Sequence, residues 1–243
     1  MNIFAKDWTG APFHFLGIEH LTALFLLVVL NFLLFRLRGA KEEQRRRAAL
    51  MMAAILWLNE VGWHVWNYAV GQWTIQTMLP LHVCSLLVWT SGFMLVAKNY
   101  TIYEFCYFLG IGGAMQALLT PDLGIYGFPH YRFFQTFISH GLIITAAIYM
   151  TVVEGFRPTW KSFVRVAVIA NLYMGVVFVI NSWIGSNYMF INHKPETPSL
   201  LDLLPPWPYY LLYEELIGFV VFLLLYLPFA LMDMRKKSRL QQT

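Results

Sequence analysis

The chain has 243 residues, a formal net charge of +4 at pH 7, and 58% hydrophobic against 12% charged residues. Soluble domains carry about 25% charged residues, so this composition excludes an ordinary soluble protein and predicts a polytopic membrane protein. The basic residues lie beside the predicted membrane-spanning segments, and no soluble domain is present to use them, so nucleic acid is not an expected partner.

Windows of about 20 predominantly apolar residues predict an all-α bundle of seven transmembrane helices in a single membrane domain over residues 1–243. In chain order the predicted spans are 16–36, 48–70, 79–97, 102–120, 132–153, 163–182 and 207–231. Of the Lys and Arg residues, fourteen fall on one side of these spans and three on the other. Because cytoplasmic loops collect Lys and Arg, we expect a multi-pass protein of the cell membrane with its N-terminus outside and its C-terminus in the cytoplasm.

The third span opens with an imidazole and a thiol, His82 and Cys84, inside an apolar run. Pro80 suits a first helical turn, so the helix is predicted to start near Leu79 and to carry Cys84 one turn in. The positive end of a helix dipole favours a thiolate there. A single membrane-helix cysteine is more often a small buried hydrophobe. Since His82 points to a different side of the helix, a base for Cys84 has to come from another helix.

Residues that are costly to bury in a bilayer gather in the outer halves of the spans, which indicates a site open to the outside. The candidate catalytic residues are Cys84 and His140, and the candidate binding or supporting residues are His82, His64, Glu60, Gln116, Asn181, Asn187, Tyr188, Tyr209 and Glu214. At ~1.5 Å of rise per residue, Cys84, His64 and His140 lie ~7, ~9 and ~12 Å below the outer helix ends, so one cavity can hold all three. For any single histidine, an interhelical hydrogen bond is the simpler explanation.

A thiol, a histidine and nearby polar donors are the elements of nucleophilic acyl transfer, in which a donor stabilises the oxyanion. Gln116 and Asn181 are the candidate donors. At outer-leaflet depth, such a site meets the ester of a phospholipid or another acyl lipid that arrives laterally from the bilayer. We therefore expect a membrane-embedded acyltransferase or acyl hydrolase that uses no cofactor and no metal.

Two other functions stay open. A metal-dependent membrane hydrolase would take zinc ligands from His64, His82, His140 and Glu60, although no compact His-x-x-x-His spacing supports this. A transporter, or a protein that binds small molecules or lipids in a polar cavity open to the outside, would favour midplane polar groups and paired halves. Here the polar residues lie on one side and no paired halves are visible.

Five segments carry a resemblance to a known family. They are Leu79–Cys84, Gln116–Asp122, Phe137–His140, Gly185–Phe190 and Leu204–Tyr209. With them the chain resembles, from end to end, the YwaF-like family of bacterial integral membrane proteins, distantly related to a eukaryotic transmembrane acyltransferase of ether phospholipids. The resemblance implies a catalytic cysteine and histidine, roles that fall on Cys84 and His140. The acyl donor and acceptor, the histidine that pairs with Cys84 and the oligomeric state stay open.

Overall fold

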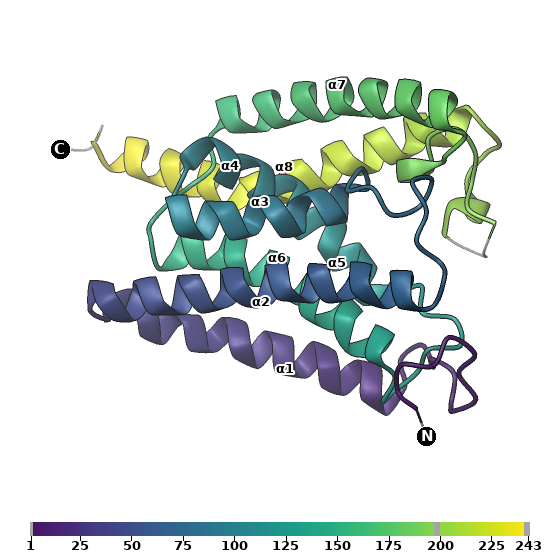
Figure 1. The fold of residues 1–243 in the computed structure, drawn as a ribbon. Coiled ribbons are helices and arrows are strands. Elements are labelled where there is room, and N and C mark those ends of the chain that lie inside the picture. The colour runs from purple at the N-terminus through teal and green to yellow at the C-terminus, as the bar shows by residue number, and fades with distance from the viewer. Residues whose placement is uncertain (1, 197–199, 241–243) are drawn as a thin grey trace. The chain divides into compact units, whose positions relative to one another are not determined.

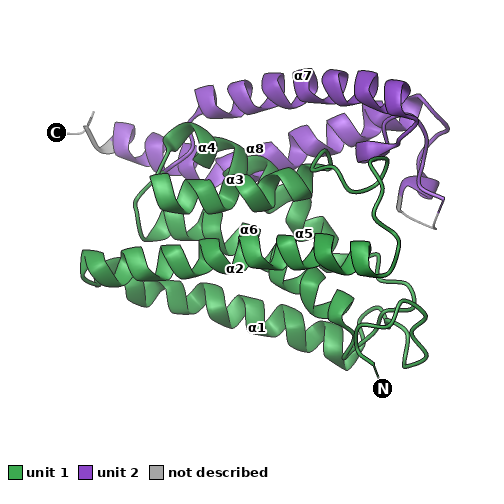
Figure 2. Ribbon diagram, viewed as in Figure 1, with its two compact units in different colours: residues 1–156 green, residues 157–243 purple. Residues whose placement is uncertain are grey.

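The computed structural model describes residues 2–196 and 200–240, and every regular element in these ranges is helical. The all-α class is thereby confirmed for the described part of the chain. The fold divides into two compact units, Met1–Phe156 and Arg157–Thr243 (Figure 2).

In its described residues, the first unit contains five long helices, counting the broken segment α4 to α5 as one (Figure 1). Its elements are α1 (Ile18–Leu34), the 3-10 helix η1 (Phe35–Gly39), α2 (Glu42–Ala69), α3 (Val83–Ala97), α4 (Tyr100–Phe105), the π-helix η2 (Cys106–Gly110), α5 (Ile111–Leu119) and α6 (Tyr131–Val152). The second unit contains α7 (Trp160–Ile184), the 3-10 helices η3 (Tyr188–Phe190) and η4 (Leu200–Leu203), and α8 (Tyr209–Leu240).

Among the described residues, six helical stretches are long and apolar enough to cross a membrane, as expected of a multi-pass membrane protein. They are Ile18–Gly39, Glu42–Ala69, Tyr100–Leu119, Tyr131–Val152, Trp160–Ile184 and Tyr209–Ser238. The third predicted span corresponds to α3, which has 15 residues and is shorter than these six. The number of seven spans therefore stays a prediction.

Helix α6 is the centre of the first unit and is buried on most sides, because it packs against α1, α2, α3 and α5. Glycines allow close packing between α6 and α1 and between α3 and α2. A Cβ at Gly141 would lie 2.3 Å from the Leu27 side chain of α1, and one at Gly92 of α3 would lie 2.3 Å from the Trp57 indole of α2. The indole of Trp57 also donates to the Trp89 carbonyl at 3.3 Å, which fixes α2 against α3.

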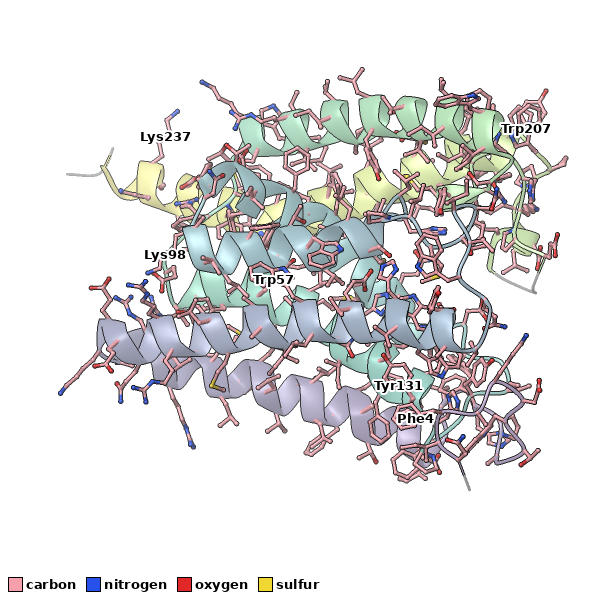
Figure 3. The ribbon with its side chains drawn as sticks, in the orientation of Figure 1. Phe4, Trp57, Lys98, Tyr131, Trp207 and Lys237 are labelled. Atoms are coloured by element: carbon pink, nitrogen blue, oxygen red, sulfur yellow. The ribbon has the colours of Figure 1, made fainter. Side chains whose placement is uncertain are left out.

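The N-terminal segment, residues 2–17, packs onto one end of the first unit. The Tyr131 N–H donates to the Ile3 carbonyl at 2.9 Å, and the Trp66 indole donates to the Phe4 carbonyl at 2.9 Å. Phe4 and Tyr131 lie together at this end, with ring centroids 5.4 Å apart (Figure 3). We call it the N-terminal end of the first unit. It brings together the C-terminus of α2 and the N-terminus of α6.

The opposite end of the first unit holds Lys98, directly after α3 (Figure 3). The Lys98 ammonium pairs with the Glu154 carboxylate at 2.8 Å, and the Tyr149 hydroxyl donates to the same carboxylate at 2.9 Å. Arg45 of α2 reaches the Val153 carbonyl at 3.4 Å. At this end, which we call the Lys98 end, Lys98 and Glu154 therefore pair directly, whereas Arg45 meets a backbone carbonyl and its Nε has no hydrogen-bond partner in the described residues.

Candidate functional site

Helix α3 begins at Val83 with His82 as its N-cap, so Cys84 is the second residue of the helix. The predicted start at Leu79 was wrong, because the Leu81 N–H donates to the Leu79 carbonyl at 2.7 Å and closes a tight turn before the helix begins. His82 is partly buried, and its side chain makes no capping hydrogen bond. Cys84 consequently lies closer to the positive end of the helix than the sequence indicated.

Two neighbouring residues of α2 connect that helix to both of its partners. The Asn59 amide donates to the Ser139 hydroxyl at 2.6 Å and to the Gln135 carbonyl at 3.0 Å, which joins α2 to α6. Next to it, the Glu60 carboxyl accepts a hydrogen bond from the Ser85 hydroxyl, which joins α2 to α3. The three helices are therefore held together at one level.

Cys84 and His140 lie at this level because each is adjacent in sequence to one of the connecting serines. Cys84 precedes Ser85, and His140 follows Ser139. The Cys84 thiol is partly buried, and within the described residues it has no hydrogen-bond partner. The structure thus puts both predicted catalytic residues at one depth of the bundle, without a direct bond between them.

The ring of His140 has its tautomer set by its own helix. Nδ1 lies 2.8 Å from the Thr136 carbonyl oxygen. Because a carbonyl can only accept, Nδ1 carries the proton, and the neutral ring has its lone pair on Nε2. His140 is partly buried. Its Nε2 is therefore the nitrogen that can accept a proton from another group.

His20 and His130 have structural roles. The Nδ1 of His20 accepts from a backbone N–H at 3.2 Å, and its Nε2 donates to the Leu118 carbonyl at 2.8 Å, which joins α1 to α5. The Nδ1 of His130 caps α6 at 3.0 Å, and its Nε2 donates to the Ala5 carbonyl at 3.1 Å. Burial lowers the pKa of His130. Both rings are fully used by backbone groups.

His64 is the second histidine near the level of Cys84, but its lone pair is engaged. The Trp73 indole donates to His64 Nδ1 at 3.0 Å, so in the neutral ring the proton is on Nε2. That nitrogen lies 3.8 Å from Oε1 of Glu60. His64 therefore has no free acceptor for a thiol proton, whereas His140 has one.

Arg132 is a charged residue at the start of α6, held by neutral groups. Its Nη1 donates to the Gln135 side chain and, at 3.1 Å, to the Thr136 hydroxyl. Its guanidinium carbon lies 4.0 Å from the centre of the Trp63 ring. Arg132 takes part in none of the ion pairs among the described residues, although the charge of Asp122 and, less strongly, that of Glu60 act on it from a longer distance. Its position is fixed and its charge has no direct partner.

Residues 15–226 match the TMEM164 family. The chain belongs to this family. Neither a curated protein nor a solved structure matches it at a significant level. The part that matches the TMEM164 family takes in both units and every predicted site residue.

The remaining candidate of the first unit, Gln116, lies near the end of α5. Its side chain is exposed and makes no hydrogen bond within the described residues, while its carbonyl accepts from the backbone of Thr120 at 2.9 Å. The structure does not bring Gln116 into contact with Cys84 or His140. Its predicted role as an oxyanion donor stays a prediction.

Asn181 belongs to the second unit, where it organises the loop after α7. Its amide nitrogen donates at 2.9 Å both to the Tyr188 carbonyl and to the Asn192 side chain. Its oxygen accepts from the Ser186 hydroxyl at 2.7 Å and from the Tyr188 N–H at 2.9 Å. Every hydrogen-bonding group of this buried amide is occupied, so its evident role is to hold the loop.

The other candidates of the second unit are one asparagine with a hydrogen bond to the loop and three residues that differ in exposure. Asn187 donates to the His193 carbonyl at 2.8 Å, Tyr188 is fully buried, Tyr209 is 60% exposed and Glu214 is partly buried. The described part of this loop is thus ordered within its own unit. A role for these residues in binding stays a prediction.

In the described part of the TMEM164 family chain, no group of three or more His, Cys, Asp or Glu side chains is arranged to hold a metal ion. The zinc set considered from the sequence, His64, His82, His140 and Glu60, does not form such a group. Within this set, His64 Nε2 lies 3.8 Å from Glu60 Oε1.

The sequence reasoning missed Arg132, Ser85, Ser139 and Thr136. It counted Arg132 only among the three charges on the outer side, at the first residue of the span 132–153, and gave it no role, whereas Arg132 is the second residue of α6. One signal was available. Arg132, Thr136 and His140 recur at intervals of four, which places them in one row on a helix.

Proposed function

We propose that the protein is a thiol-dependent acyltransferase or acyl hydrolase that acts on phospholipid from the outer leaflet, with Cys84 as nucleophile and His140 as base. The observation that carries the proposal is the tautomer of His140, whose free Nε2 lies on the helix joined through Asn59 and Glu60 to the helix of Cys84. General-base activation of a weak nucleophile requires such a lone pair.

The reaction proceeds in two halves. Nε2 of His140 takes the thiol proton while the Cys84 sulfur attacks the ester carbonyl carbon. The tetrahedral intermediate expels the lysolipid alkoxide, which receives the proton from His140, and leaves an acyl thioester on Cys84. A lysolipid hydroxyl or water, deprotonated by His140, then attacks the thioester, and the sulfur leaves with the proton to restore the thiol.

The first turn of α3 supplies donors for the oxyanion. The first intrahelical bond runs from the Leu86 N–H to the His82 carbonyl at 3.1 Å, so the N–H groups of Val83, Cys84 and Ser85 precede the helical ladder. Backbone donors beside the nucleophile are the usual means of stabilising such an intermediate. We therefore assign this role to the start of α3 in preference to Gln116 and Asn181.

The proposed topology has seven spans, with α3 as the short third one, in a single membrane domain of the cell membrane. The fourteen-to-three distribution of Lys and Arg supports an outward N-terminus and an inward C-terminus. In this orientation the N-terminal end of the first unit faces outside, and Cys84 and His140 meet the outer leaflet. The resemblance to the YwaF-like family supports the same cysteine and histidine chemistry.

The test is acyl transfer from a labelled phospholipid in reconstituted bilayers, with both lysolipid acceptor and free fatty acid followed. We expect Cys84→Ala and His140→Ala each to lower the rate about a hundredfold or more, and the double variant to be little worse than either, because the pair acts as a unit. Cys106→Ala is the matched control and keeps the rate of the unmodified protein.

Three results would contradict the proposal. The first is unchanged acyl transfer in folded Cys84→Ala or His140→Ala protein. The second is full additivity of the two losses. The third is an unmodified protein that moves no acyl groups but binds or transports a polar solute, which would favour the transporter. Loss of the activity to a chelator would favour the metal-dependent hydrolase.

A further inference from the structure

We infer that Arg132 binds the phosphate of the lipid substrate and so sets the position of the ester relative to Cys84. This inference rests on the proposed function for the identity of the substrate. It is argued from a charge that the fold holds in place without a direct counter-ion.

The guanidinium of Arg132 is held in a fixed orientation. One face lies on Trp63, which stacks on Trp66 with ring centroids 5.4 Å apart and 17° between the planes. Nη1 is held by the Gln135 and Thr136 side chains. Such stacking and hydrogen bonding fix an arginine before any ligand arrives.

The rest of the guanidinium is available for a ligand. Within the described residues, Nη2 and Nε of Arg132 have no hydrogen-bond partner and no carboxylate lies within ion-pair distance. These two nitrogens form the edge that binds two phosphate oxygens at once. A charge that served only to stabilise the fold would be expected to have a direct partner, since an unpaired charge near a bilayer is costly.

A second buried group nearby has one oxygen without a hydrogen bond. Glu60 is 3% exposed, and its Oε1 has no hydrogen-bond partner in the described residues. The charges of Asp122 and Glu60 both act on Arg132, yet neither forms an ion pair with it within the described residues, and Glu60 Oε1 lies 3.8 Å from His64 Nε2. Glu60 is instead bonded to Ser85 of α3, and it takes no part in holding the guanidinium.

The spacing along α6 fits a glycerophospholipid. Arg132 is the second residue of the helix, and His140 lies eight residues further, ~12 Å along the axis. In the lipid, the ester groups lie a few bonds from the phosphate toward the hydrocarbon. Thr136 connects the two positions, because its hydroxyl accepts from Arg132 and its carbonyl accepts from His140. A phosphate bound at Arg132 would thus direct the ester toward the level of His140 and Cys84.

The test measures binding without turnover, in the Cys84→Ala protein in a non-ionic detergent. The probes are dihexanoyl phosphatidic acid and dihexanoylglycerol, which differ by the phosphate. We expect the phosphatidic acid to bind about tenfold tighter or more, Arg132→Gln to remove the preference, and Arg132→Lys to keep part of it. Arg47→Gln, which changes an exposed arginine paired with Glu43 at 3.0 Å, is the matched control and keeps the full preference.

The inference would be overturned if the Cys84→Ala protein bound the two probes equally. It would also be overturned if Arg132→Gln kept the same preference for phosphatidic acid. Should Arg132→Gln fail to fold, the inference is tested by the preference of the Cys84→Ala protein for phosphatidic acid and by the reduction of that preference in Arg132→Lys. Competition between millimolar inorganic phosphate and the phosphatidic acid probe distinguishes a site for a lipid phosphate from a site for free phosphate. Weak competition supports a lipid phosphate, and displacement as effective as that by the lipid shows a site for free phosphate and overturns the assignment. A protein that shows the preference yet transfers no acyl group contradicts the proposed reaction alone.

Discussion

The two ends of the first unit use charge in opposite ways. At the Lys98 end, Lys98 and Glu154 form an ion pair at 2.8 Å and Tyr149 donates to the same carboxylate. At the N-terminal end, Arg132 forms no ion pair in the described residues, although the charges of Asp122 and Glu60 act on it, and Glu60 lies 3.8 Å from His64. Paired charges hold a fold together, while charges kept apart cost stability unless a ligand uses them. We therefore propose that the Lys98 end serves stability and the N-terminal end serves the proposed reaction.

The two cysteines repeat this contrast. Cys106 is fully buried, accepts from the Ser91 hydroxyl at 3.5 Å and lies 3.8 Å from the Thr90 hydroxyl. Cys84 is only partly buried and has no such partner in the described residues. A thiol with satisfied neighbours behaves as a core residue, whereas an unpartnered one beside a helix start can react.

The largest expected effect concerns the segment that covers the N-terminal end. A Cβ at Gly127 would lie 2.4 Å from the Ala11 carbonyl oxygen and 2.5 Å from that of Pro12, which are backbone atoms that cannot move alone. Gly127→Ala should therefore lower the free energy of unfolding by about 1–3 kcal/mol. Thermal unfolding in detergent measures it. Gly113→Ala is the control, because nothing lies within 4 Å of its Cβ, and equal stability of the two variants would show that the segment is not packed as described.

A smaller loss of stability is expected for a substitution of Glu154 at the Lys98 end. Burial alone would raise the pKa of Glu154, but hydrogen bonds from Lys98 and Tyr149 outweigh it and hold that pKa below its usual value of 4.5. A lowered pKa contributes stability that is complete above the usual value and is lost as the pH falls through the lowered one. Glu154→Gln should cost about 1 kcal/mol at neutral pH, after allowance for the partial exposure of Lys98.

Thermal midpoints from about pH 7 to about pH 3 test this. The unmodified protein should lose stability below about pH 4.5, and Glu154→Gln should lose less over that range. Acyl transfer at neutral pH should be the same in both proteins. A pH dependence that Glu154→Gln leaves unchanged would contradict the assignment of the Lys98 end to stability.

The smallest change in stability is expected for a substitution at Glu60, and it is a gain where the two preceding substitutions cause a loss. A neutral amide is less costly to bury than a carboxylate, and glutamine can still accept from Ser85. Glu60→Gln should unfold at the same temperature or a slightly higher one. If it lost as much stability as Glu154→Gln, the carboxylate would have to be paired, and the contrast between the two ends would fail.

The sequence predicted the helical class and the approximate spans because long apolar windows determine them locally. It misplaced the start of α3, since the preference of Pro80 for a first turn was outweighed by the turn between Leu79 and Leu81. It could not rank the histidines, because the difference between His64 and His140 depends on which nitrogen a neighbour occupies. Arg132 was missed for a similar reason, as its lack of an ion pair is visible only in three dimensions.

The most direct test of the central assignment is to trap the acyl group on the protein. Unmodified protein is incubated with a labelled-acyl phospholipid, quenched in acid, digested and examined by mass spectrometry. We predict one acyl group on the peptide that contains Cys84, removable by neutral hydroxylamine, absent from the Cys106 peptide and formed more slowly in His140→Ala protein. Continued acyl transfer with no acyl group on Cys84, or the same transfer by Cys84→Ala protein, would contradict it.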